Sequence, residues 1–184
     1  QLFFKGALKS LRDAWAPIRS PVVVLGPGFM KDDFVGYVKR EAGDLAGSIV
    51  AVKGVNSAGL SGIQESLRSG ILTNVLENLR VTDEMNAMEE FLARLGKGRM
   101  TVTYGLGDVE KAATYGAVEK LLVADSALRE TTDEKRRVLE KIMKNVEDAR
   151  GTVMVISTEH EAGTKLLSLG GIAALLRFPL PPTS

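Results

Sequence analysis

Short apolar runs alternate along this chain with segments of helical periodicity, and this alternation constrains the fold more than any other feature. The runs are apolar at most consecutive positions, rather than at every second one. Strands of that kind suit a sheet that is covered by helices on both faces. We therefore predict an α/β protein with strands at residues 21–25, 48–55, 100–104, 118–124, 152–156 and 172–178.

Between the predicted strands, apolar residues recur with the i, i+3, i+4, i+7 spacing of one helix face. Two of these segments begin with a capping-box pattern, Thr131 with Glu134 and Thr158 with Glu161, which places the first turn of each helix. We predict helices at residues 2–15, 29–45, 60–67, 82–95, 108–115, 133–149 and 158–170.

Gly96-Lys97-Gly98 is the best candidate for a linker, because two glycines flank a charged residue at the end of a predicted helix. We predict two domains, at residues 1–96 and 97–184, each long enough to form its own core. The chain opens on Gln1 inside a predicted helix, so we expect it to be a segment of a longer protein.

The composition excludes several classes of function. The chain has no cysteine and one histidine, which leaves no disulfide, no thiolate zinc site and no multi-histidine metal site within these residues. No apolar run approaches the roughly 20 residues of a membrane span. A net charge of +1 is too small to indicate a general nucleic-acid binder. We expect a cytoplasmic protein with no membrane contact.

The turn Gly26-Pro27-Gly28-Phe29 follows a predicted strand and opens a predicted helix, a position at which free N–H groups can bind a phosphate. A nucleotide site would need further glycines or a Lys-Ser/Thr pair, and neither is present. A structural turn is therefore favoured over a phosphate site. A third interpretation is that the rigid turn presents Phe29 as an exposed anchor for a partner protein.

The other candidate residues give no strong catalytic signal. Acidic pairs at Asp32/Asp33, Asp83/Glu84 and Glu89/Glu90 could bind a divalent cation, but adjacent positions diverge on a helix, so solvated faces are favoured. His160 lies between Glu159 and Glu161 with Ser157 nearby, and capping or solvation is favoured over a Ser-His-acid triad.

A basic cluster lies on the predicted helix 133–149, at Lys135-Arg136-Arg137, Lys141 and Lys144. Acidic residues interleave with it, and Asp133/Arg137 and Glu140/Lys144 have the i, i+4 spacing of helix ion pairs. A salt-bridged exposed face is favoured over contact with ribosomal RNA, because mixed charge weakens phosphate binding.

Several stretches together resemble the Pelota family, and we expect an archaeal member. They are the strings beginning at Val24 (Val-Leu-Gly-Pro-Gly-Phe), Tyr104 (Tyr-Gly-Leu-Gly-Asp-Val-Glu-Lys-Ala), Gly116 (Gly-Ala-Val-Glu-Lys-Leu-Leu-Val) and Gly170 (Gly-Gly-Ile-Ala-Ala-Leu-Leu-Arg-Phe-Pro). Their order and spacing cover about residues 22–179. The related class-one release factors carry an extra subdomain between the positions of Ala124 and Gly151, where this chain has one predicted helix.

The resemblance implies a truncated ribonuclease-H-like middle domain over residues 1–96 and an L7Ae/L30e-like α/β/α sandwich over residues 97–184. It also implies a ribosome-rescue and mRNA-surveillance factor that recognises stalled ribosomes as a tRNA mimic. Such a factor acts with a GTPase of the elongation-factor-one-alpha type and an ABC-type recycling ATPase, and it promotes subunit dissociation. Pro27, Gly28 and Phe29 match the turn credited with a role near the GTPase, so we expect them to be partner-binding residues.

Two other functions stay open at this stage: a class-one release factor that promotes peptidyl-tRNA hydrolysis through a Gly-Gly-Gln loop, and a stand-alone RNA-binding protein. We expect a monomer without a cofactor, and a binding module rather than an enzyme. The family is sometimes credited with endoribonuclease activity that requires a divalent metal. That credit attaches chiefly to its N-terminal Sm-like domain, and the residues here do not support it.

Overall fold

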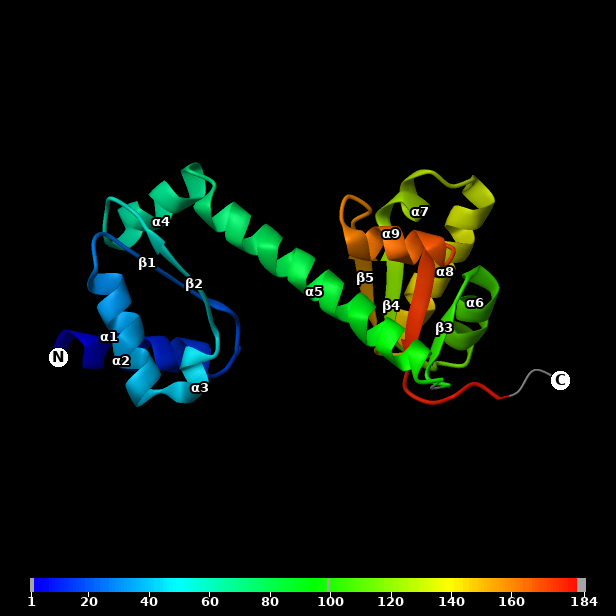
Figure 1. Ribbon diagram of the computed structural model, residues 1–184, viewed down its shortest axis with the longest axis horizontal. Helices are drawn as coiled ribbons and strands as arrows, with labels where there is room; N and C mark the ends of the chain where they lie inside the picture. The colour runs from blue at the N-terminus through cyan, green and yellow to red at the C-terminus, as the bar shows by residue number, and fades with distance from the viewer. Residues whose placement is uncertain (1, 99, 182–184) are drawn as a thin grey trace. The chain divides into compact units, whose positions relative to one another are not determined.

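The computed structural model describes residues 2–98 and 100–181, in two compact units that divide between Asn78 and Leu79 (Figure 1). The division falls inside one long helix, α5 (Ile71–Gly96), rather than at Gly96 as the linker composition indicated. The reason is packing: Met88 and Phe91 of α5 are fully buried in the core of the second unit. Across the described residues, no helix combines the length and apolar character that crossing a membrane requires.

The first unit pairs two parallel strands, β1 (Val22–Gly26) and β2 (Ile49–Gly54), with helices before, between and after them. Its core is formed where α1 and α2 meet, around Leu8, Trp15 and Val38. The helices are α1 (Leu2–Trp15), α2 (Met30–Glu41), α3 (Gly43–Ala46) and α4 (Gly59–Arg68).

The helix predicted at residues 29–45 is two helices, because Ala42 leaves the helical conformation at φ −151°. Gly43, a weak helix former, follows it, and the break allows Leu45 to enter the core completely. The prediction of a sheet covered on both faces is wrong for the described part of this unit. Every residue of β1 is only half-buried, and an open groove of about 510 Å³ runs beside that strand.

The second unit is built on a four-stranded sheet in the order β3-β6-β4-β5. Strands β4 and β5 are parallel, whereas β6 runs antiparallel to both of its neighbours. The chain's last strand therefore lies inside the sheet, and all of its residues are buried. The bounds are β3 (Val102–Tyr104), β4 (Val118–Ala124), β5 (Thr152–Ile156) and β6 (Ile172–Leu176).

Helices cover both faces of this sheet, which confirms the predicted α/β fold and α/β/α sandwich. On one face, α6 (Leu106–Thr114) and α8 (Asp133–Asp148) bury Val109 and Ile142 against the strands. On the other face, α5 and α9 (Glu161–Ser168) bury Phe91 and Leu166. A short helix, α7 (Asp125–Arg129), follows β4 and was not predicted.

Both predicted caps differ in detail from the structure. The hydroxyl that caps α8 belongs to Thr132, not Thr131, and accepts a hydrogen bond from the Lys135 amide at 3.4 Å. The helix α9 begins only at Glu161, because the hydroxyl of Thr158 donates instead to Asp125 of α7.

Candidate partner-binding site

The predicted turn lies at the carboxyl end of β1, where Pro27 and Gly28 lead into α2. Gly28 has φ +58°, a left-handed conformation that favours glycine, and a Cβ there would meet no atom within 4 Å. Phe29 occupies the N-cap position of α2. Its carbonyl accepts hydrogen bonds from the amides of Asp32 at 2.9 Å and Asp33 at 3.1 Å. The turn thus has a defined backbone on both sides of Phe29.

The side chain of Phe29 points into solvent. It is 84% exposed, and Met30 beside it is exposed as well. Ring–ring contacts among the described residues involve other aromatic side chains, such as Phe4 with Phe34, but not Phe29. Phe29 is therefore not part of the first unit's core, and its ring is free to contact another molecule.

The electrostatics of the turn do not favour a phosphate. Asp32 and Asp33 stand in the first turn of α2, where their charges would repel an anion approaching the helix N-terminus. Lys31, in the first turn of the same helix, is occupied by the Gly28 carbonyl and the Asp32 carboxylate. The favoured partner for this surface is apolar rather than anionic.

A second segment borders the turn because β1 and β2 are parallel and end at the same edge of their sheet. Ala58, which precedes α4, and Gly59, the first residue of that helix, line the same groove as Pro27 and Met30. The loop between β2 and α4 is ordered by Glu65, whose carboxylate accepts hydrogen bonds from the amides of Asn56 and Ser57.

The same hydrogen bonds affect how Glu65 titrates. The bond from the backbone of Asn56 is the largest influence, and together with those from Ser57 it holds the pKa of Glu65 below its usual value. The carboxylate therefore stays charged and keeps its partners across the neutral range. A fixed loop thus borders the groove on the α4 side.

The expectation that the three acidic pairs lie on solvated helix faces is wrong for Glu84. Asp83 is exposed as predicted, but Glu84 is 2% exposed and buried within the second unit. One oxygen of its carboxylate accepts a hydrogen bond from the Ser157 amide at 3.0 Å and lies 2.6 Å from Nε2 of His160. The other accepts a hydrogen bond from Arg80 at 3.1 Å.

A sequence signal for this burial was present and missed. Glu84 stands three, four and seven positions before Ala87, Met88 and Phe91, which form the buried stripe of α5. An acidic residue on an apolar stripe needs buried partners, and Ser157 and His160 supply them from the loop after β5.

His160 is held in a structural cluster rather than in a catalytic triad. The Ser157 hydroxyl accepts a hydrogen bond from the Glu159 amide at 3.3 Å, and the imidazole contacts Glu84 instead of that hydroxyl. The other ring nitrogen, Nδ1, is buried without a partner within the described residues. Capping by the side chain is not observed either, so the expectation of a capping or solvated histidine is wrong.

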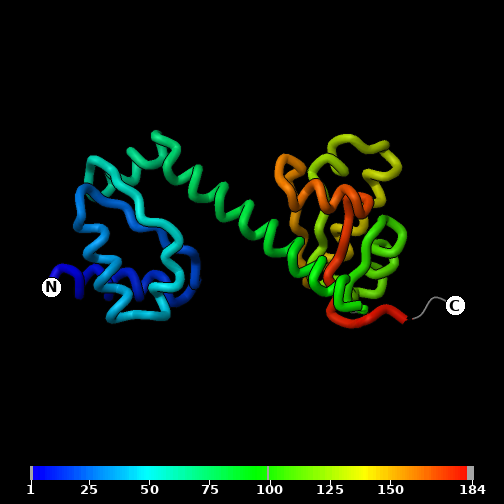
Figure 2. The backbone as a smooth tube through the Cα atoms, in the orientation of Figure 1, coloured from blue at the N-terminus to red at the C-terminus, as the bar shows by residue number. Residues whose placement is uncertain are grey.

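Asp125 holds the same loop from the side of β4. Because β4 and β5 are parallel, the chain segments that follow them leave the sheet at the same end (Figure 2), and this brings Asp125 and Thr158 together. Its carboxylate accepts hydrogen bonds from the amide and hydroxyl of Thr158, at 3.0 and 2.8 Å. Burial raises the pKa of Asp125, but these bonds, with that from Ser126 and the charge of Arg129, outweigh it and lower the pKa.

The basic cluster on α8 is exposed, and its charges are mixed. Lys141 pairs with Glu110 of α6 at 3.5 Å. The predicted ion pairs Asp133/Arg137 and Glu140/Lys144 are absent from this helix, all of whose residues the structure describes. Within residues 2–98 and 100–181, no three acidic or histidine side chains are grouped so as to hold a metal ion.

Residues 81–180 match the family model described as eRF1 domain 3. Over 159 residues, the chain is 43% identical to a protein described as a Pelota homologue from Methanocella arvoryzae, a match that covers 86% of this chain and 44% of that protein. It is 42% identical to the Pelota homologue of Thermococcus kodakarensis, with coverage of 85% and 43%. The chain thus spans about half the length of the curated relatives it matches.

Solved structures agree with the sequence relatives. An archaeal Pelota, in a model of the protein bound to the ribosome with ABCE1, superimposes with a TM-score of 0.76 at 37% identity, covering 97% of this chain and 49% of that one. Dom34 of S. cerevisiae, described as a translation termination-like factor interacting with Hbs1, gives 0.67 at 28% identity and coverage of 94% and 52%. The chain therefore belongs to the eRF1 domain 3 family, and among its members it is similar to the Pelota proteins.

Proposed function

We propose that this chain is the partner-binding part of a ribosome-rescue and mRNA-surveillance factor. In this proposal, the first unit corresponds to the Pelota middle domain and the second to its C-terminal domain, which the family model covers. The observation that carries the proposal is the exposed ring of Phe29 on a backbone fixed by Gly28 and by the start of α2. Exposed aromatic side chains on rigid turns are typical anchors of protein interfaces.

The relatives indicate which partners such a surface meets. Archaeal Pelota is described as ribosome-bound together with ABCE1, and Dom34 as interacting with Hbs1. By extension, we propose that the full-length protein recognises stalled ribosomes as a tRNA mimic in the cytoplasm. It would arrive with a GTPase of the elongation-factor-one-alpha type, contacted by Pro27, Gly28 and Phe29, and an ABC-type ATPase would then help to separate the subunits.

Binding rather than chemistry is the proposed role of this part of the protein, which we take to act as a monomer without a cofactor. The candidate groups Glu84 and His160 contact each other, and Glu84 also accepts a hydrogen bond from the Ser157 amide, so both are engaged in structural contacts. A release-factor function is less well supported, because residues 125–150 contain only α7 and α8, without an inserted subdomain. RNA binding by the second unit alone is disfavoured by the mixed charges of α8.

The experiment that tests this proposal measures binding of the chain to a GTPase of the elongation-factor-one-alpha type loaded with a non-hydrolysable GTP analogue. We expect Phe29→Ala to cost about 2 kcal/mol, a roughly 30-fold rise in Kd, as for an aromatic anchor. Ile18→Ala is the matched control, since Ile18 is an exposed apolar residue of the same unit that precedes β1. Equal binding by Phe29→Ala and the unchanged chain would refute the assigned contact.

A further inference from the structure

The side chain of Lys31 is unusually covered for a lysine on a surface helix. It is 16% exposed, although Lys31 lies in the first turn of α2. Its ammonium donates to the Gly28 carbonyl at 2.5 Å and to the Asp32 carboxylate at 2.9 Å. The ammonium therefore lies against the turn that precedes the helix, where the Asp32 carboxylate neutralises part of its charge.

The hydrogen bond from Lys31 to the Gly28 carbonyl restrains the backbone before Phe29, which the start of α2 does not fix. The carbonyl of Phe29 is tied to the amides of Asp32 and Asp33, so the helix start fixes the chain after Phe29. Before Phe29, glycine places few steric limits on its own dihedral angles, and no atom lies within 4 Å of where a Cβ of Gly28 would be. Among the described residues, the ammonium of Lys31 is the hydrogen-bond donor to the Gly28 carbonyl.

We propose that Lys31 is a positioning residue of the partner-binding site. By holding the Gly28 carbonyl, it keeps the turn in the left-handed conformation that presents the Phe29 ring, so a partner meets a preformed anchor. This inference rests on the proposed function, because Phe29 is the anchor that Lys31 positions. Lys31 acts through Phe29 and makes no contact of its own with the partner.

A double-mutant cycle separates positioning from direct contact. Binding to the GTPase loaded with the GTP analogue is measured for the unchanged chain, Lys31→Met, Phe29→Ala and the double variant. Methionine keeps the apolar stem and loses the ammonium. We expect Lys31→Met to raise Kd about tenfold, because the partner must then order the turn on binding. In the Phe29→Ala background, the same change should have no further effect.

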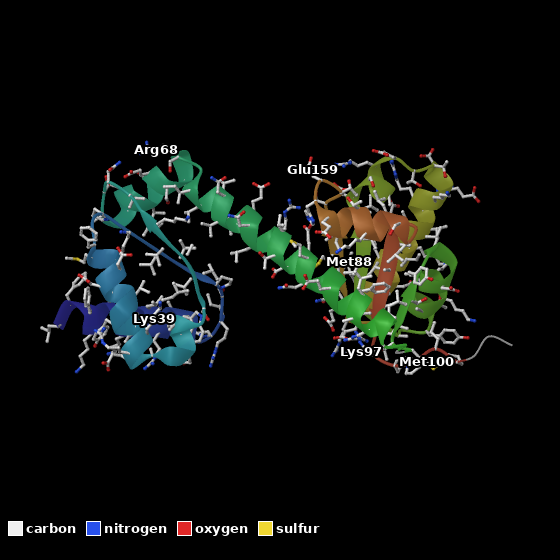
Figure 3. All side chains as sticks on the ribbon, viewed as in Figure 1. Lys39, Arg68, Met88, Lys97, Met100 and Glu159 are labelled. Atoms are coloured by element: carbon white, nitrogen blue, oxygen red, sulfur yellow. The ribbon has the colours of Figure 1, made fainter. Side chains whose placement is uncertain are left out.

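Two matched variants make the cycle specific. Lys39→Met removes the same charge from the last turn of the same helix (Figure 3), and we expect it to change Kd by less than about twofold. Lys31→Arg keeps a charged donor within reach of Gly28 and should restore most of the affinity. An equal loss from Lys31→Met in both backgrounds would mean that Lys31 touches the partner directly, and it would overturn the inference.

A second measurement needs no partner. Amide hydrogen exchange is followed by NMR in the free chain for Phe29, Asp32 and Asp33, at a temperature where every variant remains folded. Lys31→Met should speed exchange of these amides several-fold and leave the second unit unchanged. Unchanged exchange in Lys31→Met would overturn the positioning role, whatever the partner does. Normal binding by Phe29→Ala, in contrast, would refute the proposed contact and leave this structural measurement valid.

Discussion

Replacing Glu84 by alanine should destabilise the second unit severely, although the residue is a charged one on a helix. The carboxylate is 2% exposed and accepts a hydrogen bond from the Ser157 amide at 3.0 Å. Its contact with Nε2 of His160 at 2.6 Å lies in the same cluster. Alanine would leave the buried Ser157 amide and the partly buried imidazole of His160 without this partner.

The magnitude follows from those two groups. A buried donor that loses its partner costs about 1–3 kcal/mol. Ser157 is buried and His160 is partly buried, whereas Arg80 is more than half exposed and its pair with Glu84 contributes little. We therefore expect Glu84→Ala to lower the free energy of unfolding by about 4 kcal/mol, within the range for breaking a buried polar pair. Glu84→Gln keeps one acceptor oxygen and should cost about half as much.

The chain offers an internal control for the assay. Its one tryptophan, Trp15, is buried in the core of the first unit, so tryptophan fluorescence reports urea unfolding of that unit. Far-UV circular dichroism reports both units. In Glu84→Ala, the transition of the second unit should move to lower urea while the fluorescence transition stays in place. Asp83→Ala, at the exposed neighbouring position, should leave both transitions unchanged.

Two outcomes would refute the reasoning about Glu84. If Glu84→Ala unfolds at the same urea concentration as the unchanged chain, the carboxylate does not support the loop after β5. If the fluorescence transition of Trp15 shifts as far as the second transition, the effect is not confined to the second unit.

Two further predictions concern the same loop. The folded-state pKa of Asp125 is lowered, so its contribution to the free energy of unfolding is complete above the unfolded value of 3.8 and is lost as the pH falls through the folded pKa. Asp125→Asn should remove this pH dependence of stability. The NMR shift of the Thr158 amide would track the titration. Gly163→Ala should destabilise by more than about 2 kcal/mol in urea unfolding, because its Cβ would lie 2.0 Å from the Ser157 carbonyl oxygen, whereas Gly107→Ala in α6 has open space and should be neutral or slightly stabilising.

Sequence reasoning located the strands of the second unit closely. The predicted ranges 118–124 and 152–156 coincide with β4 and β5. Strand β4 lies beneath helices on both faces, so its apolar run begins and ends where the sheet does. Strand β5 lies at the edge of the sheet, and Val155 is exposed there. The predicted final strand extended to Phe178, but β6 ends at Leu176 and Phe178 is exposed. Apolar character alone does not show where the last backbone pairing stops.

The start of α5 was missed for a different reason. Helical spacing was recognised from Thr82, yet the helix begins at Ile71. Ile71, Val75 and Leu79 follow the i, i+4, i+8 spacing of one helix face, so a sequence signal for the earlier start was present and was missed. The cluster around Glu84 escaped prediction because it joins residues 73 and 76 positions apart. Only the fold brings the loop after β5, where Glu159 is labelled in Figure 3, next to α5.

An exposed apolar side chain is common on protein surfaces and by itself indicates no function. Phe29 differs because the backbone on either side of it is restrained. A phenylalanine gains about 1.5–3 kcal/mol when it is fully buried, so a flexible turn would tend to fold the ring back over the open groove. The left-handed Gly28, the hydrogen bonds of Asp32 and Asp33 to the Phe29 carbonyl, and the ammonium of Lys31 oppose that movement. With the ring held in solvent, the free chain does not make this gain, and burial of the ring against a partner would supply it.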